Sequence, residues 1–224
     1  MGGIIIAIDG PAGSGKSSVA RAVAERLGLV NLNTGAAYRA VAFLALEEGA
    51  ELDAGPELAA LAERIGLTED GAEVDGVPVA EEWLRTPEVA AAASSVSARP
   101  EVRRVLLSVQ RQAAERARAK GGAVVEGRDI GTVVLPGADL KVFLSADPQE
   151  RARRRAVQSG REQELERIHK AMSRRDRQDS ERESSPLKSA PDATVLDTTS
   201  LSLEQVIGRV LDLAGGQKER SCTK

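Results

Sequence analysis

Two short stretches of the 224-residue sequence carry residue types and spacings that could do chemistry. The first, GPAGSGKS over residues 10–17, has three glycines followed by a lysine and a serine. The second, EGRDIGTVV over residues 126–134, places two acids, an arginine and two glycines directly after an apolar run. Glycine lets a backbone turn sharply or pass close to a ligand. Both stretches are therefore candidate sites.

The first stretch fits the pattern G-x-x-x-x-G-K-[ST], which binds nucleoside triphosphates when a strand precedes it and a helix follows. Its glycines let successive backbone N–H groups turn toward one point, and the N-terminus of the helix adds positive potential. We expect Lys16 to reach the β and γ phosphates and the Ser17 hydroxyl to coordinate Mg²⁺. The predicted triphosphate site comprises Gly10, Pro11, Ala12, Gly13, Ser14, Gly15, Lys16, Ser17 and Ser18.

A triphosphate site leaves three classes of protein open: a regulatory GTPase, a mechanical ATPase and a small-molecule kinase. The guanine-reading segments N-K-x-D and T-K-x-D are absent from the sequence. The only D-x-x-G, at residues 212–215, lies at the end of the last predicted helix. The sequence therefore disfavours the GTPase.

If the protein is a kinase, its charges indicate the acceptor. A hydroxyl acceptor needs a base to take its proton. A phosphate acceptor is already largely dianionic at neutral pH and needs cations instead. Arg suits this role because its guanidinium binds phosphate in a bidentate manner. Over residues 151–182, eleven Lys and Arg stand against six Asp and Glu, a local +5 in a chain of net charge −3. Arginines that end predicted elements or lie in this stretch favour a nucleoside monophosphate acceptor: Arg39, Arg128, Arg151, Arg154, Arg155, Arg175 and Arg182.

The elements that must position these residues follow from the apolar pattern. Short, mostly continuous apolar runs predict strands buried on both faces at residues 4–8, 123–125, 140–144 and 194–196, with 30–32 as a fifth member. Helical spacing predicts helices at 17–27, 36–48, 101–120, 148–158, 161–181 and 203–213. This alternation predicts a doubly wound α/β fold with a parallel sheet. Two Asp-Gly pairs within residues 67–85 predict a hairpin-like excursion.

Composition excludes several classes of protein. Aromatic residues make up 2% of the chain and the net charge is small, which disfavours both base-stacking surfaces and bulk electrostatic binding to nucleic acid. No apolar run reaches the length of a membrane span, and a single cysteine, Cys222, cannot form an internal disulfide. We therefore expect a cytoplasmic protein with no nucleic-acid or membrane partner.

The sequence resembles a known family. GPAGSGKSS, NTGAAYRA, EGRDIGTVV, ERARRR, and RRDRQDSERESSPLKSAPDA followed by LDTT occur in this order, and together they are similar to bacterial cytidylate kinases from about residue 4 to residue 213. The phosphate loop alone is common to many families. EGRDIGTVV and the D-x-x-R-x-x-SPL ending, residues 179–187, are far more specific.

The resemblance implies a role for individual residues of the acceptor site. Arg128 and Asp129 would line the acceptor pocket at the end of the central strand, with the glycines letting the backbone pass close beneath it. Asp129 would accept the amino group of cytosine, a contact that uracil could not make. Thr34 and Arg103 match residues near the base, Ser94, Arg175 and Asp179 match the ribose-binding group, and Arg39, Arg128 and Arg182 match clamps on the α-phosphate.

The resemblance also implies a division of one domain over residues 1–214. The core would comprise about 1–35, 100–150 and 190–214, the monophosphate-binding lobe about 36–99, and a short lid about 151–182, followed by a disordered tail at 215–224. ERARRR would begin the lid, with Arg151 and Arg154 as contacts to ATP, although the sequence leaves open which of Arg151, Arg154 and Arg155 reaches the phosphates. Lid closure would exclude water from the reaction.

The sequence thus predicts an ATP:CMP phosphotransferase acting on CMP and dCMP, with Mg²⁺ and without a covalent intermediate. Lys16, Arg128, Arg154 and Arg182 would be its catalytic residues, and the family implies a monomer. Asn33 and Ser18 replace the family's usual Asp and Thr, with little functional change expected. Two alternatives stay open: another small-molecule kinase of the uridylate, adenylate or shikimate type, and a nucleotide-binding regulator that hydrolyses ATP slowly.

Overall fold

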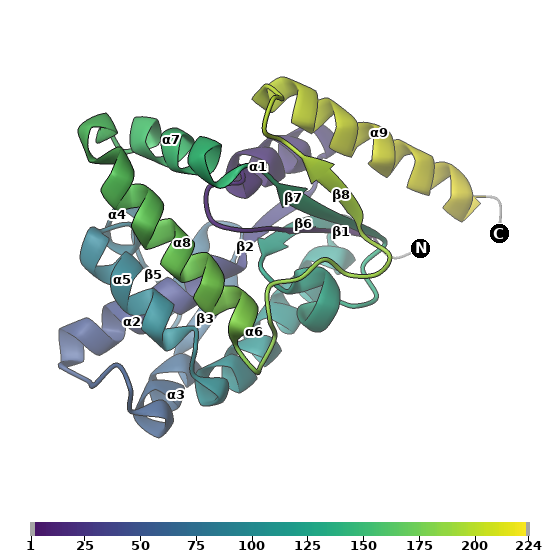
Figure 1. Ribbon diagram of the computed structural model, residues 1–224. Helices are drawn as coiled ribbons and strands as arrows, with labels where there is room; N and C mark the ends of the chain where they lie inside the picture. Colours follow the sequence, from purple (N-terminus) through teal and green to yellow (C-terminus); the bar gives the residue numbers. More distant parts are fainter. Residues whose placement is uncertain (1–2, 223–224) are drawn as a thin grey trace.

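The computed structural model describes residues 3–222, and the side chains of residues 3–216. Its main sheet has five parallel strands in the order β2-β6-β1-β7-β8, with helices on both faces (Figure 1). The prediction of a doubly wound parallel sheet is confirmed, and the short run at 30–32 forms an edge strand. The strands are β1 Ile4–Asp9, β2 Val30–Asn33, β6 Gly122–Gly127, β7 Leu140–Ser145 and β8 Thr194–Asp197.

Six long helices form in the regions where helical spacing predicts them: α1 Lys16–Leu27, α2 Thr34–Glu48, α6 Pro100–Ala119, α7 Pro148–Gln158, α8 Leu165–Glu181 and α9 Leu203–Cys222. A short 3-10 turn, Glu162–Glu164, precedes α8, so this helix starts later than the predicted residue 161. Three further helices, α3 Gly55–Glu63, α4 Glu81–Leu84 and α5 Pro87–Val96, lie between α2 and α6.

The central strand β1 is buried on both faces because successive side chains point to opposite sides of a sheet. Ile5 and Ala7 pack into a cluster that includes residues of α2 and α6, whereas Ile6 and Ile8 pack with α1 and α9. All four residues are at most 1% exposed. A core on each side therefore holds β1 rigidly.

The carboxyl ends of these parallel strands lie at one edge of the sheet, where α/β proteins bind their ligands. β1 runs into the phosphate loop at Gly10, and β6, its neighbour, runs into Arg128 and Asp129. Asp9 at the end of β1 lies in register with Gly127 at the end of β6. The fold thus brings the two candidate stretches together, although more than a hundred residues separate them in sequence.

A small antiparallel sheet forms where the sequence predicts a hairpin-like excursion. Its strands are β3 Ile65–Thr68, β4 Gly71–Val74 and β5 Val77–Pro78, in that order. Asp75 and Gly76, with φ of 51° and 78°, make a two-residue turn between β4 and β5, as an Asp-Gly pair favours. The excursion is therefore a three-stranded sheet rather than one hairpin.

Helix α9 extends to Cys222, beyond residue 213, where helical spacing predicts its end; the disordered tail at 215–224 stays a prediction. Val206, Val210 and Ala214 of α9 are at most 3% exposed. A helix anchored in this way adds one hydrogen bond for each further residue, which favours its extension. Residues 223–224 lie outside the described range.

The chain after β7 turns back over the sheet edge as α7 and α8 (Figure 1). The side chain of Ser94 on α5 donates a hydrogen bond to Gln178 on α8, at 3.4 Å. Segments 84 residues apart in sequence therefore meet across the edge of the sheet. The division of the chain into core, lobe and lid stays a prediction. Across residues 3–222, every helix is either too short or too polar to cross a membrane.

Candidate functional site

The chain between β1 and α1 is a tight loop that starts at Gly10 and ends at Gly15, the N-cap of α1. Gly10 and Gly13 have φ of 149° and 72°, a region that side chains other than glycine rarely adopt. A Cβ at Gly10 would also lie 2.2 Å from the carbonyl oxygen of Leu144. The loop therefore requires glycine, and it delivers the chain to a helix N-terminus, where backbone N–H groups attract anions.

Lys16 in the first turn of α1 is buried, and its ammonium donates to the carbonyl oxygen of Pro11 at 2.7 Å and approaches Ser14 Oγ at 3.5 Å. Burial, followed by the charge of Arg128, lowers the pKa of Lys16 well below its ordinary value. A cation held out of water beside another cation is poorly stabilised. The arrival of a polyphosphate would relieve both penalties.

Ser17 meets a residue that our sequence analysis did not single out as a site residue. Its hydroxyl donates to Oε2 of Glu126 at 2.8 Å. Glu126 is the penultimate residue of β6 and is 4% exposed, and its other oxygen, Oε1, has no hydrogen-bond partner within the described part of the chain. An acid at the end of the strand beside β1 was the available signal, because phosphate-loop enzymes hold Mg²⁺ with such a carboxylate.

The charges of Arg128 and Arg175 act on Lys16, and Glu126 acts on both Lys16 and Arg39. Burial lowers the pKa of Arg39 to about 10, with further lowering from Arg85 and from Arg175. Burial and then the charge of Arg128 lower the pKa of Arg175. The Nε atoms of Arg39 and Arg175 are buried without a partner in the described residues. This end of the site therefore holds several desolvated cations, and some of their N–H donors are free to bind an anion.

A second group of charges lies around Asp129. Arg103 of α6 donates to Asp129 Oδ2 at 2.5 Å, with both side chains at most 8% exposed. The guanidinium of Arg103 also lies 5.4 Å from the centre of the Tyr38 ring, within range of a cation–π contact. Arg182 approaches Asp129 Oδ1 at 4.0 Å. The structure thus brings Arg103, Asp129 and Arg182, which the sequence predicts for one acceptor pocket, into direct proximity.

Asp179 of α8 joins the two groups of charges. Its Oδ2 accepts from Arg128 Nε at 3.0 Å, and its Oδ1 accepts from Arg182 at 3.3 Å. Burial, and then the charge of Arg103, lowers the pKa of Arg182. One carboxylate therefore holds Arg128 of the sheet edge and Arg182, the residue after α8, in a single network.

Two hydroxyls that the sequence predicts for substrate contacts differ in their surroundings. Thr34, the first residue of α2, is buried and donates to the carbonyl oxygen of Glu126 at 2.8 Å. Ser94 is partly exposed and contacts Gln178. Asn33 is the N-cap of α2, but its side chain makes no capping hydrogen bond. Thr34 therefore lies within the site, and Ser94 lies at the contact between α5 and α8.

Arg151 at the start of α7 is held against the phosphate loop. Its guanidinium donates to the carbonyl oxygens of Ala12, at 2.9 Å, and Ala146, at 3.0 Å, and pairs with Asp176 of α8. Asp176 in turn accepts from the backbone N–H of Ala12 at 3.2 Å. Our sequence analysis did not single out Asp176, whose carboxylate occupies a loop N–H of the kind that binds phosphate.

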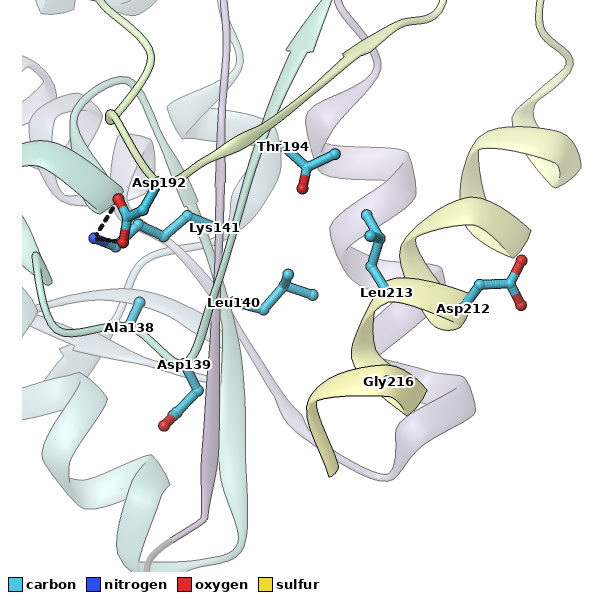
Figure 2. A pocket seen from close by; sticks show the side chains of 9 residues that line it. All are labelled: Ala138, Asp139, Leu140, Lys141, Asp192, Thr194, Asp212, Leu213 and Gly216. Atoms are coloured by element: carbon cyan, nitrogen blue, oxygen red, sulfur yellow. Dashed lines mark hydrogen bonds and ion pairs between the residues drawn. The ribbon is translucent and has the colours of Figure 1, made fainter. Parts of the chain in front are cut away.

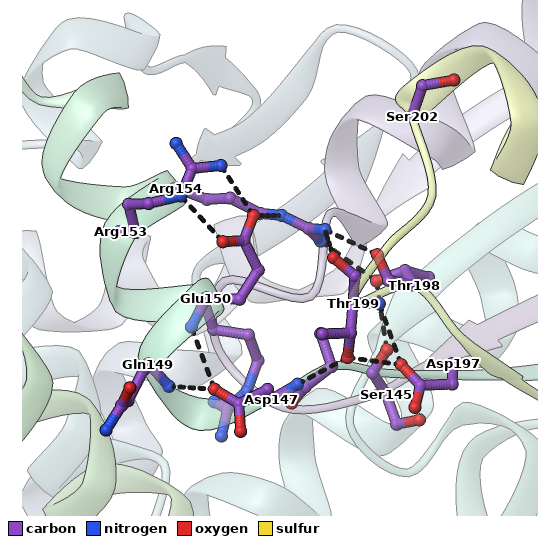
Figure 3. A network of polar contacts seen from close by, with 12 residues as sticks. Ser145, Asp147, Gln149, Glu150, Arg153, Arg154, Asp197, Thr198, Thr199 and Ser202 are labelled. Carbon is purple, nitrogen blue, oxygen red and sulfur yellow. Dashed lines mark hydrogen bonds and ion pairs between the residues drawn. The ribbon is translucent and has the colours of Figure 1, made fainter.

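Arg154 points toward the loop after β8 rather than joining the arginines around Lys16 (Figure 3). It donates to Glu150 at 2.9 Å and to the carbonyl oxygens of Thr198 and Thr199 at 2.6 Å and 3.2 Å. Arg155, by contrast, contributes to the lowered pKa of Arg175, after burial and the charge of Arg128.

A pocket of about 450 Å³ lies elsewhere, between β7, β8 and α9 (Figure 2). It is lined by Leu140 and Thr194, the first residues of β7 and β8, so it opens at the edge of the sheet opposite the phosphate loop. Lys141 in its wall is bound by both oxygens of Asp192, at 2.8 Å and 2.9 Å. This pocket is therefore separate from the candidate site.

The buried pair of Arg103 and Asp129 makes a prediction about stability. Replacing Arg103 by Met removes the nearest cation from a buried carboxylate, which we expect to lower the free energy of unfolding by roughly 3 kcal/mol. Arg118→Met on the same helix is the control, because the Arg118–Asp139 pair is 3.4 Å long and 31% and 43% exposed; its loss should be within about 1 kcal/mol. Urea unfolding measures both, and equal losses would contradict the argument.

Comparison with known proteins agrees with this arrangement. The family model described as cytidylate kinase matches residues 6–215. A cytidylate kinase of an Exiguobacterium species is 47% identical over 210 residues, covering 90% of this chain and 92% of its own. That of Desulfitobacterium hafniense is 44% identical over 222 residues, covering 96% and 94%.

Solved structures support the fold. A gluconokinase from Sinorhizobium meliloti has a TM-score of 0.54 at 16% identity, with 99% of this chain and 97% of that chain covered. At this identity the likeness extends to the fold alone. The matching family model and the identity to curated relatives carry the assignment further: the chain belongs to the cytidylate kinase family.

Proposed function

We propose that this protein transfers the γ-phosphoryl group of ATP to CMP and dCMP. The observation that carries the proposal is the pair of linked charge groups at one edge of the sheet: desolvated cations around Lys16, and the Arg103–Asp129–Arg182 group joined to them through Asp179. Two anionic substrates that must approach each other require this excess of positive charge. Catalysis would consist of positioning and charge neutralisation.

The residues take the following roles in this proposal. The phosphate loop and Lys16 bind the triphosphate, and Arg39, Arg128 and Arg182 hold the α-phosphate of CMP. Ser94, Arg175 and Asp179 bind the ribose, while Thr34, Arg103 and Asp129 surround the base. Because Arg103 occupies Oδ2 of Asp129, Oδ1 is the oxygen we assign to the cytosine amine. Arg151 and Arg154 belong to the lid, and contact between Arg154 and ATP would require its bonds to Glu150 and Thr198 to break.

Mg²⁺ fits the residues at the end of β6. Oε1 of Glu126, which is buried and has no partner among the residues that the structure describes, lies on the same carboxylate that binds the Ser17 hydroxyl. We propose that Ser17 and Glu126 together hold Mg²⁺ with the nucleotide, directly or through its water. When bound, the ion would neutralise charge on the β and γ phosphates. The cytoplasmic location and monomeric state stay predictions.

The activity is tested by measuring ADP release with CMP, dCMP, UMP, AMP and shikimate as acceptors. We expect turnover that depends on the acceptor and is fastest with CMP or dCMP. A different preferred acceptor would assign the protein to another kinase type. Slow ADP release that no acceptor stimulates would identify a nucleotide-binding regulator and refute the proposal.

Lys16→Met should separate catalysis from stability. We expect turnover to fall by about a hundredfold or more, since the lysine stabilises developing charge on the phosphates. The melting temperature should stay the same or rise, because the variant removes a buried cation that Arg128 repels. Calorimetry beside the kinetic assay checks both. A fall in stability parallel to the loss of activity would count against a catalytic role.

Glu126→Gln should change the requirement for metal. The amide retains an acceptor for Ser17 but loses the negative charge, so we expect the Mg²⁺ concentration for half-maximal activity to rise about tenfold. Glu25→Gln, at an exposed position of α1, is the control and should match the wild type. An unchanged Mg²⁺ requirement in Glu126→Gln would remove Glu126 from the metal site.

A further inference from the structure

Asp9 is a buried carboxylate that the roles above leave unexplained. It ends β1 and is 5% exposed. Its Oδ1 accepts the backbone N–H of Ile130 at 2.8 Å, and its Oδ2 accepts that of Gly131 at 2.7 Å. These contacts span 121 and 122 residues of sequence. Both oxygens of Asp9 therefore serve one short segment of backbone.

The ionised form of Asp9 is costly in this place. Burial raises its pKa from 3.8 to about 6, even though the two backbone N–H groups and Lys16 act in the opposite direction. A buried carboxylate with a strongly shifted pKa often has a role in a functional site. Only a carboxylate offers two acceptor oxygens to two N–H groups, since an amide of the same shape offers one oxygen and a donor.

The segment that Asp9 holds begins directly after Arg128 and Asp129. β6 ends at Gly127, and the π-helical turn Ile130–Val134 starts three residues later. The two acceptor residues are therefore the whole connection between a strand that pairs with β1 and a turn that is bound to the end of β1. A short π-helical turn of this kind is rare and often occurs at functional sites.

Close packing leaves this segment little freedom to move. Ile130 is fully buried. A Cβ on Gly131 would lie 3.1 Å from Lys141 and 3.4 Å from Asp9 Oδ2, and a Cβ on Gly127 would lie 2.7 Å from Thr34 Oγ1. Neither glycine has a positive φ. Close approach thus requires glycine at 127 and makes position 131 tight, with Asp9 as the polar anchor.

We propose that Asp9 is a positioning residue of the acceptor site: its carboxylate fixes the backbone of residues 130–131 and so sets the directions in which Arg128 and Asp129 point. This inference rests on the proposed CMP kinase function. Asp9 itself need not touch either substrate. Its loss would leave the phosphate loop and Lys16 in place but allow the acceptor residues to shift.

The charges that face Asp9 are few. Lys16 faces it from α1, and Asp129 faces it from the start of the loop. Opposite it in register, β6 and β7 present the uncharged Gly127 and Phe143. Lys141 of β7 lies beside Gly131, but its ammonium is bound to Asp192. Protonation of Asp9 would therefore replace an acceptor oxygen by a donor at the loop.

The test compares Asp9→Asn with the wild type in steady-state kinetics. We expect the KM for CMP to rise about tenfold or more, since one buried N–H loses its acceptor, with a smaller fall in kcat. Binding of a non-hydrolysable ATP analogue, measured by calorimetry, should change less than twofold. Asp139→Asn is the matched control, because Asp139 also accepts a backbone N–H of β1, that of Ile5 at 2.7 Å, but at the opposite end of the strand.

The dependence on pH separates positioning from a general loss of structure. Above about pH 6 wild-type Asp9 is ionised and holds both N–H groups; below it, Asp9 protonates and resembles Asn. The ratio of the variant's KM for CMP to that of the wild type should therefore shrink as the pH falls from 7.5 to 5.5. Ionisation of the CMP phosphate, with a pKa near 6, affects both proteins and cancels in the ratio.

A measurement on the wild type alone keeps the inference testable if Asp9→Asn does not fold. In nuclear magnetic resonance spectra without nucleotides, the amide protons of Ile130 and Gly131 should shift together, with a midpoint near pH 6. The inference would be overturned if the amides of Ile130 and Gly131 did not titrate between pH 5 and 8. It would also be overturned if the ratio of the two KM values for CMP did not depend on pH, or if Asp9→Asn lost affinity for CMP and for the ATP analogue equally. Absence of CMP-dependent turnover in the wild type would instead refute the proposed function.

Discussion

Positive charge held out of water is the constraint on which this structure depends. Lys16 is buried, and Arg39 and Arg175 are partly buried, close to other cations, and the loss of water lowers the pKa of each. Such an arrangement is unfavourable in the absence of anions. It becomes favourable when phosphate groups bring negative charge to the donors. The electrostatic cost of these cations in the free protein is therefore the source of its affinity for two phosphorylated substrates.

Carboxylates limit this repulsion and at the same time link distant segments. Asp179 joins Arg128 of the sheet edge to Arg182, and Asp176 joins Arg151 to the phosphate loop. Both acids lie on α8, so this helix is attached to the site by ion pairs rather than by a broad apolar face; Asp179 is its only fully buried residue. Phosphates that bind the same donors would compete with these acids, which gives α8 a physical reason to respond to nucleotides.

Much of the fold could be predicted from local pattern, and the misses have physical causes. Five apolar runs became the five strands because parallel strands buried on both faces have no polar positions to interrupt them. The sequence pattern did not predict helices α3 and α5, because Ala-rich segments show little contrast between an apolar and a polar face. Helix α9 extends beyond the predicted residue 213, because its anchoring on the sheet through Val210 and Ala214 cannot be seen in the local pattern.

The sequence by itself determined the phosphate loop, because that site is built from consecutive backbone groups whose geometry glycines and one helix N-terminus dictate. Through family resemblance it also predicted acceptor-site side chains, of which the structure brings Arg103, Asp129 and Arg182 together. Only the tertiary structure decided which polar groups meet: Glu126 with the Ser17 hydroxyl, Asp9 with the backbone N–H of Gly131, and Arg154 with the loop after β8. These partners lie 44 to 122 residues apart, and each side chain could bond to many donors or acceptors until strand order and helix packing bring particular groups within hydrogen-bonding distance.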